Sequence, residues 1–154
     1  MKEATRIADQ LQRSYVGGAW HGPSLRQVLA GADARRAAAH PIPHAHCIWE
    51  LVLHVTAWNR AVLRRVEGQS TRVSAAENFP KVTDTNPVAW KRALGDLADA
   101  HGALHRAILR LPDSRLGRKV AGRPQSLYFM LHGLVQHNIY HAGQMALLKK
   151  ARKK

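Results

Sequence analysis

Residues 127–150 read LYFMLHGLVQHNIYHAGQMALLKK, and their apolar side chains recur in steps of three and four. That spacing is typical of an amphipathic helix that turns one face towards a protein core. Ser126 can cap the start of this helix, and the lysines in its last turn suit the negative end of the helix dipole. The residues predicted on the inward face are Met130, Leu134, His137, His141, Met145 and Leu148.

Three further segments show the same helical periodicity, and each is followed by a residue that ends helices. The segments cover about residues 2–16, 47–67 and 86–111, and the residues that end them are Gly17, Gly68 and Pro112. Two short helices are predicted between the first two long ones, at about 25–30 and 33–39.

Two connections remain between the long helices. We expect residues 69–85 to form a polar connection without regular structure, and residues 112–125 to form a loop with a short hairpin. The chain has no alternating strand pattern of any length and no internal repeat. The sequence therefore predicts an all-α fold, a four-helix bundle with short extra helices between the first and second long helices.

The composition fits one domain, which we expect at residues 1–150, followed by a basic tail at 151–154. No run approaches the roughly 20 apolar residues of a transmembrane helix, and the N-terminus lacks the apolar segment of a signal peptide. Cys47 is the only cysteine, so no intrachain disulfide can form, and we expect it to be a small buried residue. These features favour a cytoplasmic protein.

The charge balance is strongly basic, with 24 Lys and Arg against 10 Asp and Glu, a formal net charge of +14 and a pI near 11.1. Such a balance can indicate a nucleic-acid partner. The basic residues are scattered, however, and only the last six positions are dense. Because no known DNA- or RNA-binding motif accompanies them, we favour a solvated basic surface over nucleic-acid binding.

Two histidines on the last helix suggest a metal site. His137 and His141 are four residues apart, so they lie on one helical face. Two imidazoles in that relation can hold one divalent ion if a neighbouring helix supplies a third ligand, and His54 is the candidate. Gln144, three residues beyond His141, could orient a ligand through a hydrogen bond. A buried histidine can instead be a hydrogen-bonded core residue, so spacing alone leaves both interpretations open.

Other histidines compete for the same role. His101 and His105 show the same spacing on the third long helix, with His101 on the inward face. Because His105 lies off the apolar stripe, we interpret the pair as one core and one rim histidine. His44 and His46 precede the second long helix, and we expect both to be exposed.

The carboxylate of a zinc-protease motif is missing, because Asn138 follows His137 where that motif has glutamate. Glu50, one helical turn before His54, is the nearest carboxylate in the pattern. It is a candidate hydrogen-bond acceptor or general base for a centre at His54, although an exposed helix glutamate with no such role is the more common interpretation.

Three segments of the chain resemble the DinB superfamily (DinB/YfiT-like metalloenzymes). They are residues 20–25 (WHGPSL), 48–58 (IWELVLHVTAW) and 131–144 (LHGLVQHNIYHAGQ). The resemblance extends from the first helix to about Leu148. Its most specific part is the His-x-x-x-His-x-Gly-Gln motif on the last helix, paired with the leucine-rich segment around His54.

The resemblance implies a helical bundle that holds a divalent metal with three histidines, which fall on His54, His137 and His141. Zinc or nickel is the expected metal, with iron or manganese as alternatives. Some members of the family are thiol S-transferases that use bacillithiol or mycothiol, others are thiol-dependent isomerases, and many have no known reaction. A homodimer would be in keeping with the family.

Four functions follow as hypotheses. The leading one is a metal-dependent enzyme that transfers a low-molecular-weight thiol to an electrophile. The second is a metal-dependent hydrolase with Glu50 or a histidine as base, and the third is a non-catalytic metal-binding stress-response protein. The fourth, a nucleic-acid binder, rests on the net charge of +14 alone. The expected partner is a small thiol or another small substrate, with no membrane and no nucleic acid.

Overall fold

The computed structural model describes residues 1–151, and within that range the chain is helical without a strand. The prediction of an all-α fold is confirmed. Arg152, Lys153 and Lys154, in the predicted basic tail, lie outside the described residues. The long helices are α1 (Glu3–Val16), α4 (Ile48–Val66), α6 (Pro87–Leu109) and α7 (Leu127–Lys150). The short ones are α2 (Leu25–Leu29), α3 (Ala34–Ala38), α5 (Ala75–Asn78) and a 3₁₀ turn, η1 (Asp113–Arg115).

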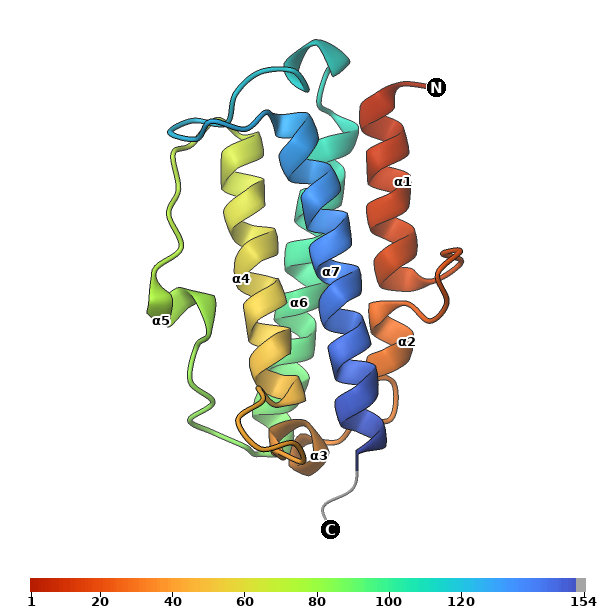
Figure 1. Cartoon of the computed structure of the whole chain (residues 1–154), viewed down its shortest axis with the longest axis vertical. Helices are drawn as coiled ribbons and strands as arrows, with labels where there is room; N and C mark the ends of the chain where they lie inside the picture. Colours follow the sequence, from red (N-terminus) through yellow and green to blue (C-terminus); the bar gives the residue numbers. More distant parts are fainter. Residues whose placement is uncertain (152–154) are drawn as a thin grey trace.

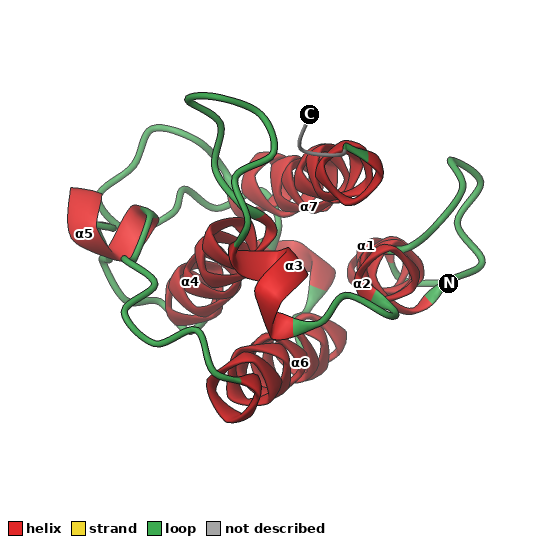
Figure 2. Cartoon of the chain, turned by 90° about the horizontal axis from the view of Figure 1, so that it is seen from below, coloured by secondary structure: helices red, strands yellow, loops and turns green. Residues whose placement is uncertain are grey.

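The four long helices lie side by side, as Figures 1 and 2 show. Helix α4 packs against both α6 and α7, and α1 packs against the same two helices from the other side. In Figure 1, α1 and α7 run downwards whereas α4 and α6 run upwards. Because α4 and α6 are parallel neighbours, the chain between them must return along the length of the molecule. This long connection, residues 67–86, carries α5 past the middle of α4.

Side-chain caps set the starts of α6 and α7 where the sequence predicts them. The Asn86 side chain accepts from the Ala89 N–H, and Pro87 occupies the first turn of α6. Ser126 accepts from the Phe129 N–H at the start of α7. These polar residues satisfy backbone donors that the first helical turn leaves unpaired.

Two apolar clusters fill the interior, one at each end of the long helices. One contains Leu51, Val52 and Met145, and the other contains Leu11 and Leu104. A layer of buried polar side chains separates them at mid-height. Its members include His54, Asn59, His101, Asn138 and His141. Each of these groups needs a partner there, because burying an unpaired polar group is costly.

The connection from residue 69 to 85 differs from its prediction, because it contains α5. The Ser74 side chain accepts from the Glu77 N–H, and the Glu77 carboxylate accepts from the Ser74 N–H. This reciprocal capping box stabilises a single helical turn in an otherwise polar segment. Between residues 112 and 125, η1 precedes a turn across which Lys119 pairs with Ser126 in one antiparallel bridge.

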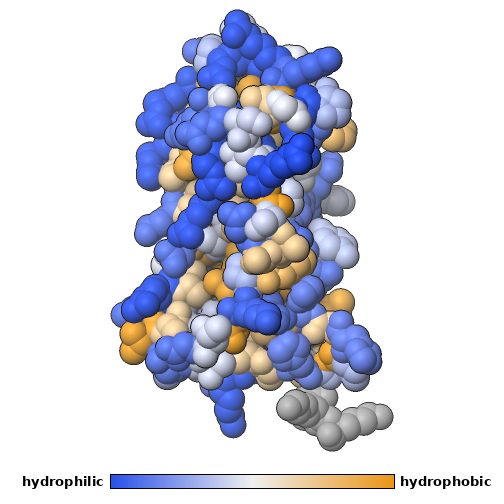
Figure 3. All heavy atoms as spheres, turned by 90° about the vertical axis from the view of Figure 1, so that its left-hand side faces the viewer, coloured by the Kyte–Doolittle hydropathy of each residue, from blue (hydrophilic) through white to orange (hydrophobic). Residues whose placement is uncertain are grey.

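The surface over α5 and the long connection is mostly hydrophilic, with apolar side chains showing in its lower half (Figure 3). None of the helices in residues 1–151 is both long enough and apolar enough to cross a membrane.

Replacing Leu104 tests the packing of the second cluster. Leu104 is 0% exposed, so Leu104→Ala leaves a cavity and should lower the free energy of unfolding by about 2–5 kcal/mol. Leu147 on α7 is 67% exposed, and Leu147→Ala should change that energy by no more than about 0.5 kcal/mol. Urea denaturation followed by circular dichroism measures both. Equal effects of the two substitutions would contradict the arrangement of the core.

Candidate metal centre

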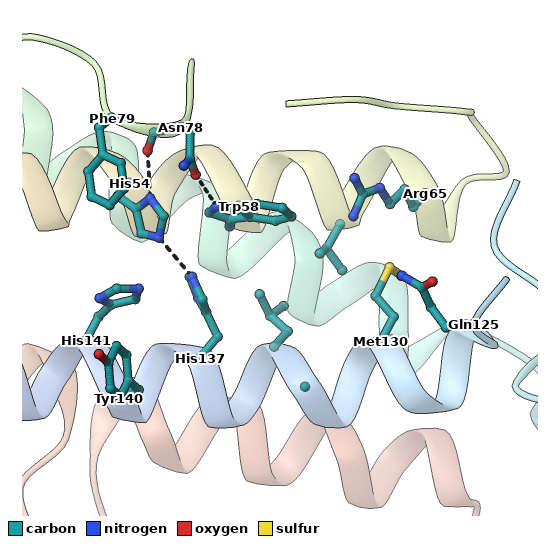
Figure 4. Close-up of a pocket in the computed structure, with 13 residues that line it drawn as sticks. His54, Trp58, Arg65, Asn78, Phe79, Gln125, Met130, His137, Tyr140 and His141 are labelled. Carbon is teal, nitrogen blue, oxygen red and sulfur yellow. Dashed lines mark hydrogen bonds between the residues drawn. The ribbon is translucent and has the colours of Figure 1, made fainter. Parts of the chain in front are cut away.

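Three imidazoles meet in the polar layer, His54 from α4 and His137 and His141 from α7. Each offers one nitrogen, and these atoms lie within 4.8 Å of one another. The Nε2 atoms of His54 and His137 are 2.9 Å apart (Figure 4). Ligand atoms around a tetrahedral zinc ion, with bonds of about 2.0–2.1 Å, are about 3.3 Å apart. The three rings are therefore close to the separation that one ion requires.

The other nitrogen of each ring faces an oxygen acceptor. The Asn78 backbone carbonyl can only accept, so His54 Nδ1 carries the proton and His54 Nε2 keeps its lone pair. With the Asn138 and Gln144 amides turned as they are, the same holds for His137 and His141. Partners of this kind orient histidines that bind metals. The contacts are His54 Nδ1 to the Asn78 carbonyl at 2.6 Å, His141 Nδ1 to Gln144 Oε1 at 2.6 Å and His137 Nδ1 to Asn138 Oδ1 at 3.3 Å.

This protonation pattern places two lone pairs, those of His54 and His137, 2.9 Å apart. Two acceptors at that distance repel one another unless a cation or a proton lies between them. A divalent ion held by the three rings would resolve the conflict while all three Nδ1–H contacts are kept. The residues present thus fit a bound metal and could hold one.

Burial also keeps the rings in the form that binds metals. It is the largest cause that lowers the pKa of His54, of His141 and of His137, the last to about 4. The neighbouring imidazoles lower the pKa of His54 and His137 further, because two positive rings would repel. All three are neutral at pH 7, as metal ligation requires.

The long connection closes one side of the centre. The Phe79 ring stacks on His54 with centroids 4.2 Å apart and, on its other face, on His46 at 3.8 Å. Trp58 Nε1 donates to Asn78 Oδ1 at 2.8 Å, which fixes the residue whose carbonyl holds His54. Sequence reasoning did not assign Asn78 and Phe79 to the site. Asn78 is the last residue of α5 and Phe79 follows it, so the Ser74–Glu77 capping box was the available signal.

A cavity of about 520 Å³ adjoins the three imidazoles between α4 and α7 (Figure 4). Its volume is in the range of small-molecule sites. Its walls are mainly apolar, and one charged side chain, Arg65, lines it. The apolar lining residues are Trp58, Val62, Phe79, Met130 and Leu134.

The structure corrects the candidate role of Glu50. Its Oε2 atom accepts from the Cys47 N–H at 2.9 Å and lies 3.3 Å from His40 Nε2 and 3.2 Å from His46 Nδ1. Glu50 is the third residue of α4, and a capping box turns its carboxylate back to the start of the helix. The carboxylate therefore does not serve His54, whose acceptor is a backbone carbonyl. Cys47 is buried, as expected, and caps α4.

The alternative pair on α6 consists of one core histidine, His101, and one rim histidine, His105. His101 is buried, its Nε2–H donates to Gln12 Oε1 at 3.0 Å, and its ring stacks on Tyr15 at 4.1 Å. His105 is only partly buried. Within residues 1–151, no third ligand joins this pair. His44 and His46 are exposed, as predicted.

A comparison with protein families matches residues 9–145 to the DinB superfamily. The chain belongs to the DinB superfamily. The matched range includes His54, His137 and His141, so this assignment and the geometry concern the same part of the molecule. The resemblance inferred from the sequence is confirmed. Searches among curated proteins and among solved structures each gave no match.

Metal content tests the centre directly. Untagged wild-type protein, purified without a nickel column and incubated with zinc, should contain one ion per chain, and His137→Ala should lose it because two imidazoles remain. Elemental analysis after gel filtration measures the ratio. His105→Ala is the control, since His105 is also a partly buried histidine in a His-x-x-x-His pair. Wild type without metal would exclude the centre.

Acid should lower the free energy of unfolding of the metal-free protein through His101. Burial of this side chain lowers its pKa to about 4. The unfolded chain binds a proton near pH 6.5 that the folded chain excludes, so stability falls from pH 6.5 towards pH 4. His101 contributes a slope of at most about 1.4 kcal/mol per pH unit there. His101→Leu should flatten the decline, as measured by urea denaturation in a chelator.

The control for this pH dependence is His21→Leu, because His21 is exposed in a turn. It should leave the decline unchanged. If His101→Leu also leaves it unchanged, His101 is not the group that excludes the proton.

Proposed function

We propose that this DinB-superfamily chain binds one divalent metal ion through His54, His137 and His141. We further propose that it transfers a low-molecular-weight thiol to an electrophile. The observation that carries the choice of reaction is the lining of the adjoining cavity. Among the residues described by the structure, this lining includes no aspartate and no glutamate.

The absence of a lining carboxylate favours a thiol over water as the nucleophile. A divalent ion lowers the pKa of a thiol or water at its open position. A thiol starts from a pKa of about 8.5 and water from about 15.7, so a thiol loses its proton more readily and depends less on a protein base. The hydrolase alternative needs Glu50 or a histidine as base, and the Glu50 carboxylate is engaged at the start of α4.

The chain's own residues have positioning roles in this reaction. Asn78 and Gln144 hold two imidazoles in orientation through their Nδ1–H groups. Trp58 and Leu134 keep the cavity wall apolar, which limits water near the reacting sulfur. During transfer the thiol proton passes to solvent, sulfur forms a bond to the electrophilic carbon, and the leaving group departs with its electron pair.

The histidine set favours zinc or nickel, with iron or manganese as alternatives. The proposed partner is a small thiol. The homodimer and the absence of a nucleic-acid partner stay predictions, as does the cytoplasmic location.

Thiol conjugation tests this proposal. Zinc- or nickel-loaded protein is incubated with low-molecular-weight thiols and an alkyl halide, and the thioether product is measured by chromatography. Wild type should accelerate product formation, and His141→Ala should fall to the background rate because the centre loses a ligand. Leu147→Ala, an exposed change on the same helix, should retain the wild-type rate. A metal-loaded wild type without turnover would favour the non-catalytic alternative.

A further inference from the structure

Arg65 lies at the opposite end of the cavity from the three imidazoles (Figure 4). It follows His54 by eleven residues on α4, so the two residues are about 16 Å apart along the helix axis. Arg65 is only 4% exposed, although it carries a charge. The long dimension of the cavity therefore joins a group of metal-binding side chains to a buried cation.

No carboxylate within residues 1–151 pairs with Arg65. Its Nε and Nη2 groups donate to the Thr71 carbonyl at 3.3 and 2.9 Å, and its guanidinium lies 5.5 Å from the centroid of the Trp58 ring. Buried charges in proteins are ordinarily paired, so this guanidinium calls for an explanation.

The surrounding charges are also positive. Burial lowers the pKa of Arg65 from its ordinary value, and the nearby Arg123 and Arg64 guanidiniums lower it further. Gln125, which can donate through its amide, lines the same end of the cavity (Figure 4). This end of the cavity is thus suited to receive negative charge.

A purely structural role accounts for only some of the hydrogen-bond donors of the Arg65 guanidinium. The two hydrogen bonds to Thr71 hold the start of the long connection against α4. They use one edge of the group, and its Nη1 makes no hydrogen bond within residues 1–151. Arginine has five donors in a fork that matches a carboxylate, so a free edge in a cavity is a ready anion site.

The middle of the cavity is apolar. Val62 lies between His54 and Arg65 on α4, and Leu134 lies between Met130 and His137 on α7, so both line the cavity between its two polar ends. Met130 lies beside Gln125 at the Arg65 end (Figure 4). A ligand that spans the cavity must therefore have an apolar central part.

We propose that the cavity binds an elongated thiol that carries a carboxylate, with sulfur at the three-histidine centre and the carboxylate at Arg65. The inference rests on the proposed function, because it assigns the substrate class of the same site. Arg65 sets specificity and takes no part in bond formation.

Binding of simple thiols to the cobalt(II)-loaded protein tests the inference. The three histidines provide no sulfur ligand, so a sulfur-to-cobalt charge-transfer band that appears on addition reports thiol ligation. The probes are ω-mercaptoalkanoic acids of increasing chain length and the ω-mercaptoalkanols of the same lengths. Long acids should bind about 10- to 100-fold more tightly than the matched alcohols, whereas short acids should show no advantage.

Substitutions at residues 64 and 65 test whether the tighter binding of the long acids depends on Arg65. Arg65→Gln should remove the advantage of the long acids and leave the alcohols unchanged, and Arg65→Lys should retain part of it. Arg64→Gln is the matched control, because it removes the adjacent positive charge outside the cavity lining. The comparison of acids with alcohols in wild type stands even if an Arg65 variant fails to fold.

The outcomes separate the two proposals. If acids and alcohols of every length ligate cobalt equally well, the role of Arg65 is overturned while thiol binding at the centre stands. If Arg64→Gln removes the advantage as fully as Arg65→Gln does, the tighter binding of the long acids comes from the general positive charge of the surface and not from a specific site at Arg65. If no thiol produces the band, the proposed function fails and the inference fails with it.

Discussion

Three neutral imidazoles lie between the two apolar clusters, and the hydrogen bonds in the middle of the molecule are arranged around them. Each ring must place its N–H on an acceptor, because an unpaired donor is costly away from water. Asn78, Gln144 and Asn138 supply those acceptors from three different positions. Once these contacts form, the three Nε2 atoms converge, so the polar layer and the metal-binding geometry have the same origin.

The parallel course of α4 and α6 makes the long connection part of the site. The chain must travel the length of the molecule between these helices, and it passes the cavity on the way. Thr71 near its start holds Arg65, and Asn78 and Phe79 farther along contact Trp58 and His54. A segment needed to link two helices thereby positions both ends of the cavity.

Patterns local in sequence predicted the long helices and the common face of His137 and His141, because apolar spacing and caps act within a few residues. The start and end of α7 and the inward face with His137 and His141 are examples. The contacts of residues 78–79 with His54 depend on the path of the connection, which no periodicity encodes. Glu50 was a candidate because helical spacing places it near His54, whereas its capping role turns the carboxylate away. Arg65 is one of 24 basic residues, and only burial distinguishes it.

Helix α5 is a single turn without a buried residue, yet the residue at its end holds His54. Segments with so little buried surface open at a much lower free energy than the whole fold does. Each such opening would take from His54 both its hydrogen-bond acceptor and its stacking partner. An ion held at this centre would therefore be released through local opening of this connection, without unfolding of the whole chain.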